Sequence, residues 1–369
     1  MQYDYLIVGA GLFGSIMARQ LTDAGYKCLV VEKRNHIGGN CYSEVIEGIH
    51  VSKYGGHIFH TNSDKIWDYV NRFAKFRYYY HIVRVNYKEK IYSFPLNMMT
   101  LYQLWGVKTP EEAEKKLKEV RQNIPKPSNL EEWCLANVGE EIYNTFIKGY
   151  NIKFWKKDPK ELPASLIKRL PIRMTYGNGY FTDKHQGFPE NGFTVMFERM
   201  LDGIETRLET DFFSNKEHLE SLASHVVFTG KIDQYYNYKY GKLDYHTLRF
   251  VNKTYDGNYQ GSATINYTDE NVPYNRVIEH KHFQPHKKND KSVVTFEYTD
   301  TWGPDKTPYY PINNKVNNGI YKKYKALGAN NNKIIFGGRL AEYKYYDMDQ
   351  VVGSALKKAK DEIKRRSNG

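Results

Sequence analysis

The sequence predicts an α/β fold, and three features of the chain lead to this prediction. A short apolar run at residues 5–8 enters the glycine-rich turn G-A-G-L-F-G, after which a helical pattern begins. A second apolar run at 28–31 ends in Glu32, and apolar strands return at 226–228 and 333–336. Together they predict a Rossmann-like dinucleotide-binding domain, with a helical insertion and an antiparallel β-sheet domain between its parts.

The glycine-rich turn carries the chemical part of this prediction. Gly9 allows the sharp turn, Gly11 lets the backbone approach a pyrophosphate, and Gly14 lets helix and strand pack closely. Glu32 lies about 20 residues further on, where a carboxylate accepts hydrogen bonds from a ribose. The alternative is an ordinary tight turn, with a solvated charge at Glu32.

The chain has 369 residues and a formal net charge of +12. Many lysines are mixed with acidic residues on surface-like stretches, such as 112–121 and 357–366, which argues against nucleic acid as a partner. A positive field also favours an acidic substrate such as a nucleotide diphosphate. The 33 tyrosines exceed what a core needs and predict sites where rings and hydroxyls meet a ligand.

Cysteines and apolar runs address the cellular compartment. Cys28, Cys41 and Cys134 show no metal-ligand spacing, which predicts a reduced, cytoplasmic protein. The first strand begins at residue 3, where a signal peptide has no room, and no apolar run approaches a membrane span in length. We therefore expect no membrane span.

Two further glycine pairs follow the second strand. Gly38 and Gly39 precede Asn40, and a later pair precedes His57 and His60. Such glycines let the backbone pass close to a cofactor, and an ordinary turn is the alternative. Two histidines three residues apart suit a metal, but no carboxylate or cysteine stands at a supporting spacing. We expect no metal site, and contacts to a ligand instead.

Helix signals dominate the middle of the chain. A capping box at Thr109, and a second from Ser128 to Glu131, predict a helical insertion over residues 98–165. Residues 149–163 combine aromatic side chains, lysines and prolines without a clear period. This composition predicts a mobile loop that closes over a ligand.

Alternating segments rich in tyrosine and threonine predict the antiparallel sheet domain, which includes a hairpin that turns at residues 86–90. We assign residues 78–97, 166–190 and 240–325 to this domain, and residues 1–77, 191–239 and 326–369 to the dinucleotide-binding domain.

The last predicted strand leads into a possible ligand seat. Gly337, Gly338 and Arg339 follow it, and Asp347 with Gln350 marks the start of a terminal helix that ends in basic residues. A glycine pair, an arginine and a helix N-terminus together suit an electron-rich ring edge. A plain terminal helix is the alternative.

Several motifs occur together between the first strand and the last helix. They are G-A-G-L-F-G, E-K-R-N-H-I-G-G-N, Y-G-G-H-I-F-H-T, P-Y-N-R-V-I-E-H-K-H, P-Y-Y-P and G-G-R-L-A-E-Y-K-Y-Y-D-M. In this combination the chain resembles the bacterial UDP-galactopyranose mutase family. The resemblance implies a homodimeric flavoenzyme with a FAD-binding α/β domain and a nucleotide-sugar substrate in a cleft over the flavin.

The resemblance also implies a reaction. N5 of the reduced flavin attacks the anomeric carbon, and UDP-galactopyranose and UDP-galactofuranose interconvert without net oxidation, for cell-surface polysaccharide synthesis. The residues agree with this chemistry, because one dinucleotide turn is present and no acid pair or nucleophile triad is evident. A cofactor then carries the hard step, and arginines are expected to bind the departing diphosphate.

Motif matching implies roles for individual residues. For catalysis it implies Arg169 and Arg276 at the diphosphate, and His60 near the reacting ring. Surface or ion-pair arginines and aromatic core packing are the alternatives. The implied substrate-binding residues are His81, Gln103, Phe146, Tyr150, Asn151, Trp155, Tyr180, Asn266, Tyr310 and Tyr345. The implied FAD-binding residues are Gly9, Gly11, Phe13, Gly14, Glu32, Lys33, Asn40, Gly56, His57, Arg339, Asp347 and Met348.

Some positions depart from the galactose-specific pattern. His81 replaces an asparagine, Asn151 a threonine, His185 an aromatic residue and His246 an arginine. The substrate is therefore either UDP-galactose or a modified hexose, N-acetylated, deoxy or amino, on UDP or dTDP. A flavin oxidase or desaturase, and a non-catalytic nucleotide-sugar-binding protein, are the other classes left open.

Overall fold

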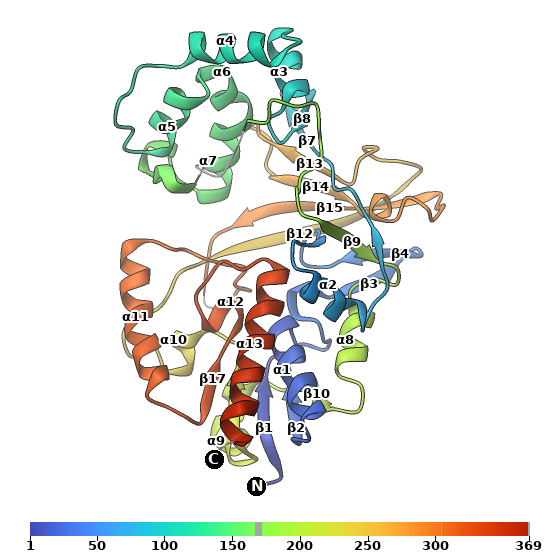
Figure 1. Cartoon of the computed structure of the whole chain (residues 1–369), viewed down its shortest axis with the longest axis vertical. Coiled ribbons are helices and arrows are strands. Elements are labelled where there is room, and N and C mark those ends of the chain that lie inside the picture. Colours follow the sequence, from blue (N-terminus) through green and yellow to red (C-terminus); the bar gives the residue numbers. More distant parts are fainter. Residues whose placement is uncertain (167–171, 304, 368–369) are drawn as a thin grey trace.

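The computed structural model describes residues 1–166, 172–303 and 305–367. Figure 1 shows an elongated molecule, with the domain that holds both chain ends at the bottom, a large sheet across the middle and a group of helices at the top. Arg169, which has a predicted catalytic role, lies outside the described residues. Every helix in the described part is too short or too polar to traverse a lipid bilayer.

A parallel five-stranded sheet forms the centre of the first domain, in the order β10-β2-β1-β11-β17. Ile7 at its centre pairs with Val30 on one side and Val227 on the other. The three central strands carry buried apolar runs at residues 5–8, 28–31 and 226–228, and the predicted Rossmann-like α/β fold is confirmed. The strands are β1 (Tyr3–Val8), β2 (Cys28–Val31), β10 (Glu205–Arg207), β11 (Ala223–Phe228) and β17 (Ile334–Phe336).

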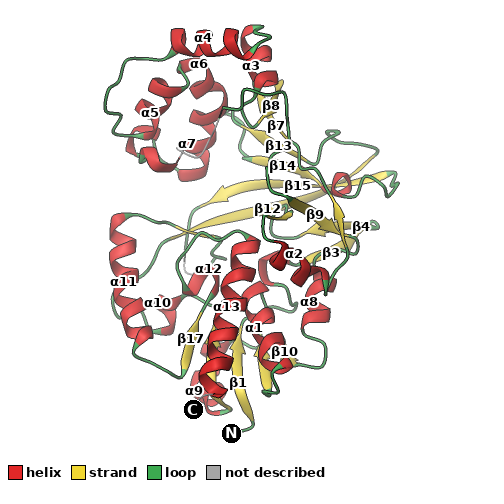
Figure 2. Cartoon of the chain, viewed as in Figure 1, coloured by secondary structure: helices red, strands yellow, loops and turns green. Residues whose placement is uncertain are grey.

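Helix α1 follows the glycine turn and packs against the C-terminal helix α13 (Figure 2). Ile16 and Met17 of α1 share one buried cluster with Val352, Ala355 and Ala359 of α13, whose small side chains allow a close approach. The helices of this part are α1 (Leu12–Asp23), α2 (Asp64–Asn71), α8 (Thr194–Met200), α9 (Lys216–Ser221), α10 (Ile232–Tyr235), α11 (Lys315–Ala329), α12 (Gly338–Ala341) and α13 (Met348–Ser367).

The large sheet has seven strands in the order β16-β12-β15-β14-β13-β7-β8. Its neighbours are antiparallel except β13 and β7, which run parallel. The hairpin β7–β8 turns at Lys88 and Glu89, both with positive φ, where the sequence predicts it. The strands are β7 (Val83–Tyr87), β8 (Lys90–Phe94), β12 (Tyr245–Asp256), β13 (Thr264–Tyr267), β14 (Arg276–Glu279), β15 (Lys291–Asp300) and β16 (Tyr310–Pro311).

Two small sheets lie beside these. β3 (Ser43–Ile46) pairs with β4 (Ile49–Ser52), and β9 (His185–Pro189) pairs with β5 (Phe59–Thr61) and β6 (Phe76–Tyr78). The segment 166–190, which the sequence assigns to the antiparallel sheet domain, therefore contributes β9 to a separate sheet. The reason is Phe188, which is buried in the core cluster of the first domain between Phe193 and Phe283.

The helical insertion has its own core, which includes Leu117, Cys134 and Phe146. The capping box at Thr109 is present, but the second box is wrong by one residue, because Asn129 caps α5 and Leu130 is the buried residue that starts it. The elements are α3 (Met98–Trp105), α4 (Pro110–Val120), α5 (Leu130–Asn137), α6 (Glu140–Ile142), a π-helix (Tyr143–Lys148), α7 (Gly149–Trp155), and short 3₁₀ turns at Pro159–Glu161 and Ala164–Leu166.

Residues 149–155 form α7, and the prediction of a loop there is wrong. The helix is held from outside, because the buried Lys153 donates to backbone carbonyls of the turn between β13 and β14. Such tertiary contacts override a weak local pattern. The helix ends at Trp155, and its C-cap Lys156 adopts a left-handed conformation with φ of 54°.

Candidate functional site

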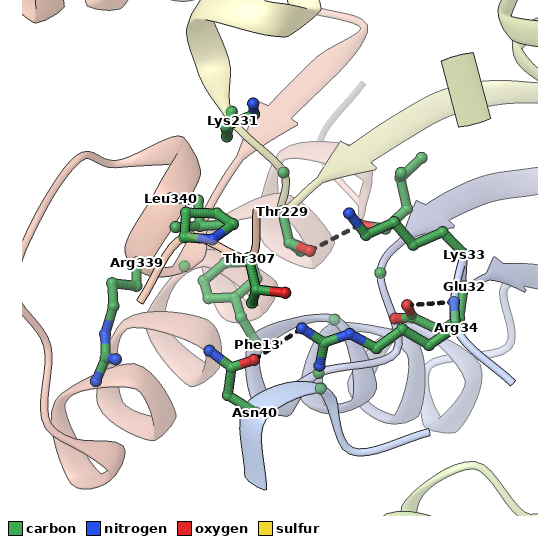
Figure 3. A pocket seen from close by; sticks show the side chains of 18 of the residues that line it. Phe13, Glu32, Lys33, Arg34, Asn40, Thr229, Lys231, Thr307, Arg339 and Leu340 are labelled. Carbon is green, nitrogen blue, oxygen red and sulfur yellow. Dashed lines mark hydrogen bonds between the residues drawn. The ribbon is translucent and has the colours of Figure 1, made fainter. Parts of the chain in front are cut away.

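A cavity of about 530 Å³ opens at the carboxyl ends of the parallel strands (Figure 3). Rossmann-like folds bind dinucleotides at this edge of the sheet. The predicted cofactor residues that line the cavity are Gly9, Gly11, Phe13, Gly14, Glu32, Lys33, Asn40, His57, Arg339 and Met348. Gly56 and Asp347 are not among its lining residues; each precedes one that is.

The glycines of the turn are required for different reasons. Gly9 has φ of +103°, which favours glycine, and a Cβ atom on Gly14 would overlap the carbonyl oxygen of Gly9. A Cβ atom on Gly11 would meet only the Cα of Gly39, at an ordinary contact distance of 3.7 Å. The protein's own packing therefore needs Gly9 and Gly14, whereas Gly11 leaves the cavity open.

Glu32 is fixed by the backbone at the end of β2. Its Oε2 accepts a hydrogen bond from Ala10 N at 2.9 Å, and its Oε1 accepts one from Arg34 N at 3.0 Å. Arg34 donates in turn to Oδ1 of Asn40 at 2.9 Å, and its guanidinium lies 4.4 Å from the ring centre of Tyr54. A carboxylate held in this way suits a ribose hydroxyl.

Arg339 and His57 form the other end of the cavity. Arg339 donates to the carbonyl oxygens of Tyr309 at 3.0 Å and Tyr346 at 2.6 Å, which fixes its guanidinium. Burial, and then the Arg339 charge, lower the pKa of His57 to about 4, so its ring is neutral near pH 7. Its Nδ1 is buried and has no hydrogen-bond partner among the described residues.

The sequence does not predict several lining residues of this cavity. Asp211 and Phe212 follow β10, Thr229 and Lys231 follow β11, and Thr307 precedes β16. They come from distant segments and meet only because parallel strands end at one edge. The one available signal was the strand that ends just before Thr229.

A second cluster surrounds Arg276 on β14. Its Nε donates to Oδ1 of Asn266 on β13 at 3.1 Å, and its Nη1 lies 3.8 Å from Oε2 of the buried Glu297 on β15. Burial acts against the charge, but Glu297 and the neighbouring tyrosine hydroxyls of Tyr150, Tyr180 and Tyr310 outweigh it. The pKa of Arg276 therefore lies above its ordinary value.

Tyr310 joins the two clusters. The Arg339 guanidinium lies 4.9 Å from the Tyr310 ring centre, and Tyr310 stacks on Tyr345 with ring centres 5.0 Å apart. Burial raises the pKa of the Tyr310 hydroxyl, and the nearby charges of Arg339 and Arg276 both act to lower it. Arg276, Tyr310 and Tyr345, to which motif matching gives roles at the diphosphate and sugar, therefore lie beside the Arg339 end of the cavity.

Two predicted histidines lie on one aromatic side chain, Phe181. His60 stacks on it at 3.7 Å between ring centres, and its Nδ1 lies 3.0 Å from Oδ2 of Asp183. His81 packs at 5.6 Å and also contacts Tyr180 at 5.7 Å. Burial, and then the charges of Arg276 and His60, lower the pKa of His81 to about 3, so its ring is neutral. Its Nδ1 has no partner within the described part of the chain.

Other predicted substrate residues are engaged elsewhere. Gln103 accepts from Ser93 N and donates to the Ile91 carbonyl on β8. Phe146 is buried in the core of the insertion, and Asn151 Nδ2 donates to the Ile147 carbonyl one turn earlier. In this structure the polar groups of Gln103 and Asn151 are therefore bonded to backbone, and the Phe146 ring packs in a core.

Trp155 contacts the large sheet through His246 on β12, one of the positions that depart from the family pattern. The two rings meet edge to face at 4.4 Å, and Phe154 lies 4.9 Å from the same imidazole. Burial lowers the pKa of His246 to about 4. His185, another departure, stacks on Trp67 at 5.1 Å and lies 2.6 Å from Asp64.

Comparisons with known proteins agree with this geometry. The model of the UDP-galactopyranose mutase family matches residues 145–345, and that of the NAD(P)-binding Rossmann-like domain matches residues 7–73. A Klebsiella pneumoniae protein described as a probable UDP-galactopyranose mutase is 40% identical over 371 residues, covering 99% of this chain and 96% of its own. A dTDP-fucopyranose mutase from Escherichia coli is also 40% identical, over 97% of this chain and 98% of its own. A crystal structure of reduced UDP-galactopyranose mutase superposes with a TM-score of 0.73 at 14% identity, covering 97% and 94% of the two chains.

Proposed function

This chain belongs to the UDP-galactopyranose mutase family, and from that premise we propose that it is an isomerase that interconverts the pyranose and furanose forms of a nucleotide-diphosphate hexose. UDP-galactose is the reference substrate, and FAD is the proposed cofactor. The observation that carries the proposal is the junction at Tyr310, where the dinucleotide cavity meets the Arg276 cluster.

The residues of the cavity fit FAD. Gly11 leaves room for a pyrophosphate, and Glu32 offers a fixed carboxylate to a ribose. The buried Nδ1 of His57, which has no partner in the described part of the chain, lies at the Arg339 end. When bound and reduced, FAD supplies a nucleophilic nitrogen for the anomeric carbon, with no net oxidation over the cycle. Gly56, Asp347 and Met348 remain further proposed contacts by motif.

Arg276 would stabilise the departing nucleoside diphosphate. Its charge is secured by Glu297, and its direction is fixed by Asn266, so it needs no rearrangement as negative charge develops. Tyr150, Tyr180 and Tyr310 would add hydroxyl donors around the same oxygens. We propose that Arg169 contributes a second cation, on the strength of its motif.

The identity of the sugar is a separate proposal. The mutase relatives that are 40% identical are named for different sugars, UDP-galactopyranose and dTDP-fucopyranose. Sequence identity alone therefore favours neither sugar as the substrate. His81 is a neutral ring among Tyr79, Tyr180 and Phe181, and it is bulkier than an asparagine and presents its donor and acceptor at different positions. This aromatic surrounding favours a modified hexose, such as a deoxy sugar, as the second candidate substrate.

A panel experiment tests both proposals. Dithionite-reduced protein is incubated anaerobically with UDP-galactose, UDP-N-acetylgalactosamine and dTDP-fucose, and furanose formation is followed by chromatography. Conversion of at least one sugar, only when the flavin is reduced, is expected. Oxidised products with stoichiometric oxygen consumption would indicate an oxidase instead, and tight nucleotide binding without conversion would indicate a binding protein.

A further inference from the structure

One face of the helical run that includes α7 rests on the turn between β13 and β14, residues 267–275. Thr145, Gly149 and Lys153 are spaced four residues apart, so they share this face. The Thr268 hydroxyl donates to the Thr145 carbonyl at 2.6 Å, and a Cβ atom on Gly149 would overlap the Thr268 carbonyl oxygen. The helix and the turn are therefore in direct backbone contact.

Lys153 makes the strongest polar contact of this interface. Its Nζ donates to the carbonyl oxygens of Tyr267 at 2.7 Å, Val272 at 3.0 Å and Tyr274 at 2.9 Å. An ammonium group has three N–H donors, so each one is used. The residue is only 7% exposed, and burying a charge costs free energy unless its hydrogen bonds are made. Lys153 therefore gathers the carbonyls of the turn around one point.

The turn leads directly to the proposed substrate residues. Tyr267 follows Asn266, and Tyr274 lies two residues before Arg276. On the helix, Tyr150 is three residues before Lys153 and lies close to the Arg276 charge. The same ammonium therefore connects Tyr150 with the strands that carry Asn266 and Arg276.

We propose that Lys153 is a positioning residue for the reaction, whose ammonium holds α7 against the β13–β14 turn so that Tyr150, Asn266 and Arg276 face one diphosphate. This role rests on the proposed function, since it concerns the same site. A packing role alone would not require a cation, because a methionine of similar length would fill the volume without the cost of burying a charge.

The test compares Lys153→Met with Lys148→Met, a matched change at an exposed lysine of the preceding turn. Holoprotein of each variant is titrated with UDP and dTDP by calorimetry, and amide hydrogen exchange of residues 145–155 and 267–275 is measured without nucleotide. We expect full flavin occupancy in both, faster exchange of both segments in Lys153→Met, and nucleotide binding weakened by about tenfold or more. Turnover of the panel substrate should show a raised KM with a smaller change in kcat, and the Lys148 variant should match the wild type.

If Lys153→Met does not fold, a second variant, Lys153→Arg, tests the positioning role in its place. The planar guanidinium of arginine keeps the charge but cannot point at all three carbonyls. This variant should fold and still bind nucleotide more weakly than the wild type. Unchanged exchange in a folded variant would overturn the contact, and faster exchange with unchanged nucleotide affinity would overturn the positioning role. If the wild type binds no nucleotide although exchange responds as expected, the proposed function fails and the role of Lys153 in the substrate site fails with it, whereas the structural contact stands.

Discussion

The dinucleotide cavity and the Arg276 cluster are built in different ways. The cavity is made largely by backbone, with a glycine turn, strand ends and a carboxylate that accepts from main-chain N–H groups. The cluster is made largely by side chains from α7, β13, β14, β15 and β16, which meet only in the folded protein. Main-chain contacts do not depend on most side-chain identities, so single substitutions rarely change the ligand of a backbone site, whereas they can change the ligand of a side-chain site. We therefore expect cofactor binding to be fixed and sugar choice to be variable.

The largest expected effects come from two glycines of one turn. Gly14→Ala places a methyl group against the Gly9 carbonyl and should destabilise the protein by about 3 kcal/mol or more. In Gly11→Val the Cβ atom meets the protein only at an ordinary contact distance but would obstruct a pyrophosphate, so this variant should fold and purify without FAD. Thermal unfolding and the flavin absorbance of both variants test these expectations. A Gly11→Val protein that still carries its flavin, and is therefore yellow, would show that the turn does not bind the cofactor.

Arg276→Ala tests the side-chain cluster with the cavity intact. Loss of a preorganised cation should cost about 2 to 4 kcal/mol of transition-state stabilisation, on the order of a hundredfold in rate or more. Flavin occupancy should stay complete, because Arg276 is not among the cavity's lining residues. We expect the same of Arg169→Ala, and turnover at the wild-type rate would remove the arginine concerned from the mechanism.

The contact between Trp155 and His246 should depend on pH and on nucleotide. Burial lowers the pKa of His246 from 6.5 to about 4, so the unfolded chain binds this proton more readily. The free energy of unfolding should therefore fall as pH falls from 6.5 to 4, by up to about 3 kcal/mol from this residue. His246→Phe should reduce the slope of denaturant-derived stability against pH in this window by that contribution, and an unchanged slope would argue against a neutral, buried His246. UDP binding should also change tryptophan fluorescence or protect Lys156 and Lys157 from proteolysis. The absence of either response would argue against closure of residues 149–163 over a ligand.

The smallest expected effect concerns sugar preference. His81→Asn restores an amide that both donates and accepts, and it should shift the ratio of kcat/KM values toward UDP-galactose by roughly tenfold. Adding Asn151→Thr should contribute less, since Asn151 already donates to its own helix. If the wild type converts UDP-galactose most efficiently and the double variant only loses activity, His81 does not set the preference.

The same contrast explains what the sequence predicts. The turn at Gly9 to Gly14, Glu32 and the hairpin at β7–β8 follow from local patterns, because short-range backbone geometry determines them. The helix at α7 does not, because Lys153 is held by carbonyls more than a hundred residues away in the chain. Lining residues such as Thr229 and Thr307 escape prediction for the same reason, since strand order brings them to the cavity.

The most direct test of the account is the number of product molecules formed per reduced flavin. Anaerobic protein is reduced once, freed of excess dithionite and mixed with the substrate that the panel identifies. We expect many furanose or pyranose products per flavin, with the flavin still reduced at the end, because a mutase regenerates the cofactor in each cycle. One product per reduced flavin, with the flavin oxidised, would contradict it.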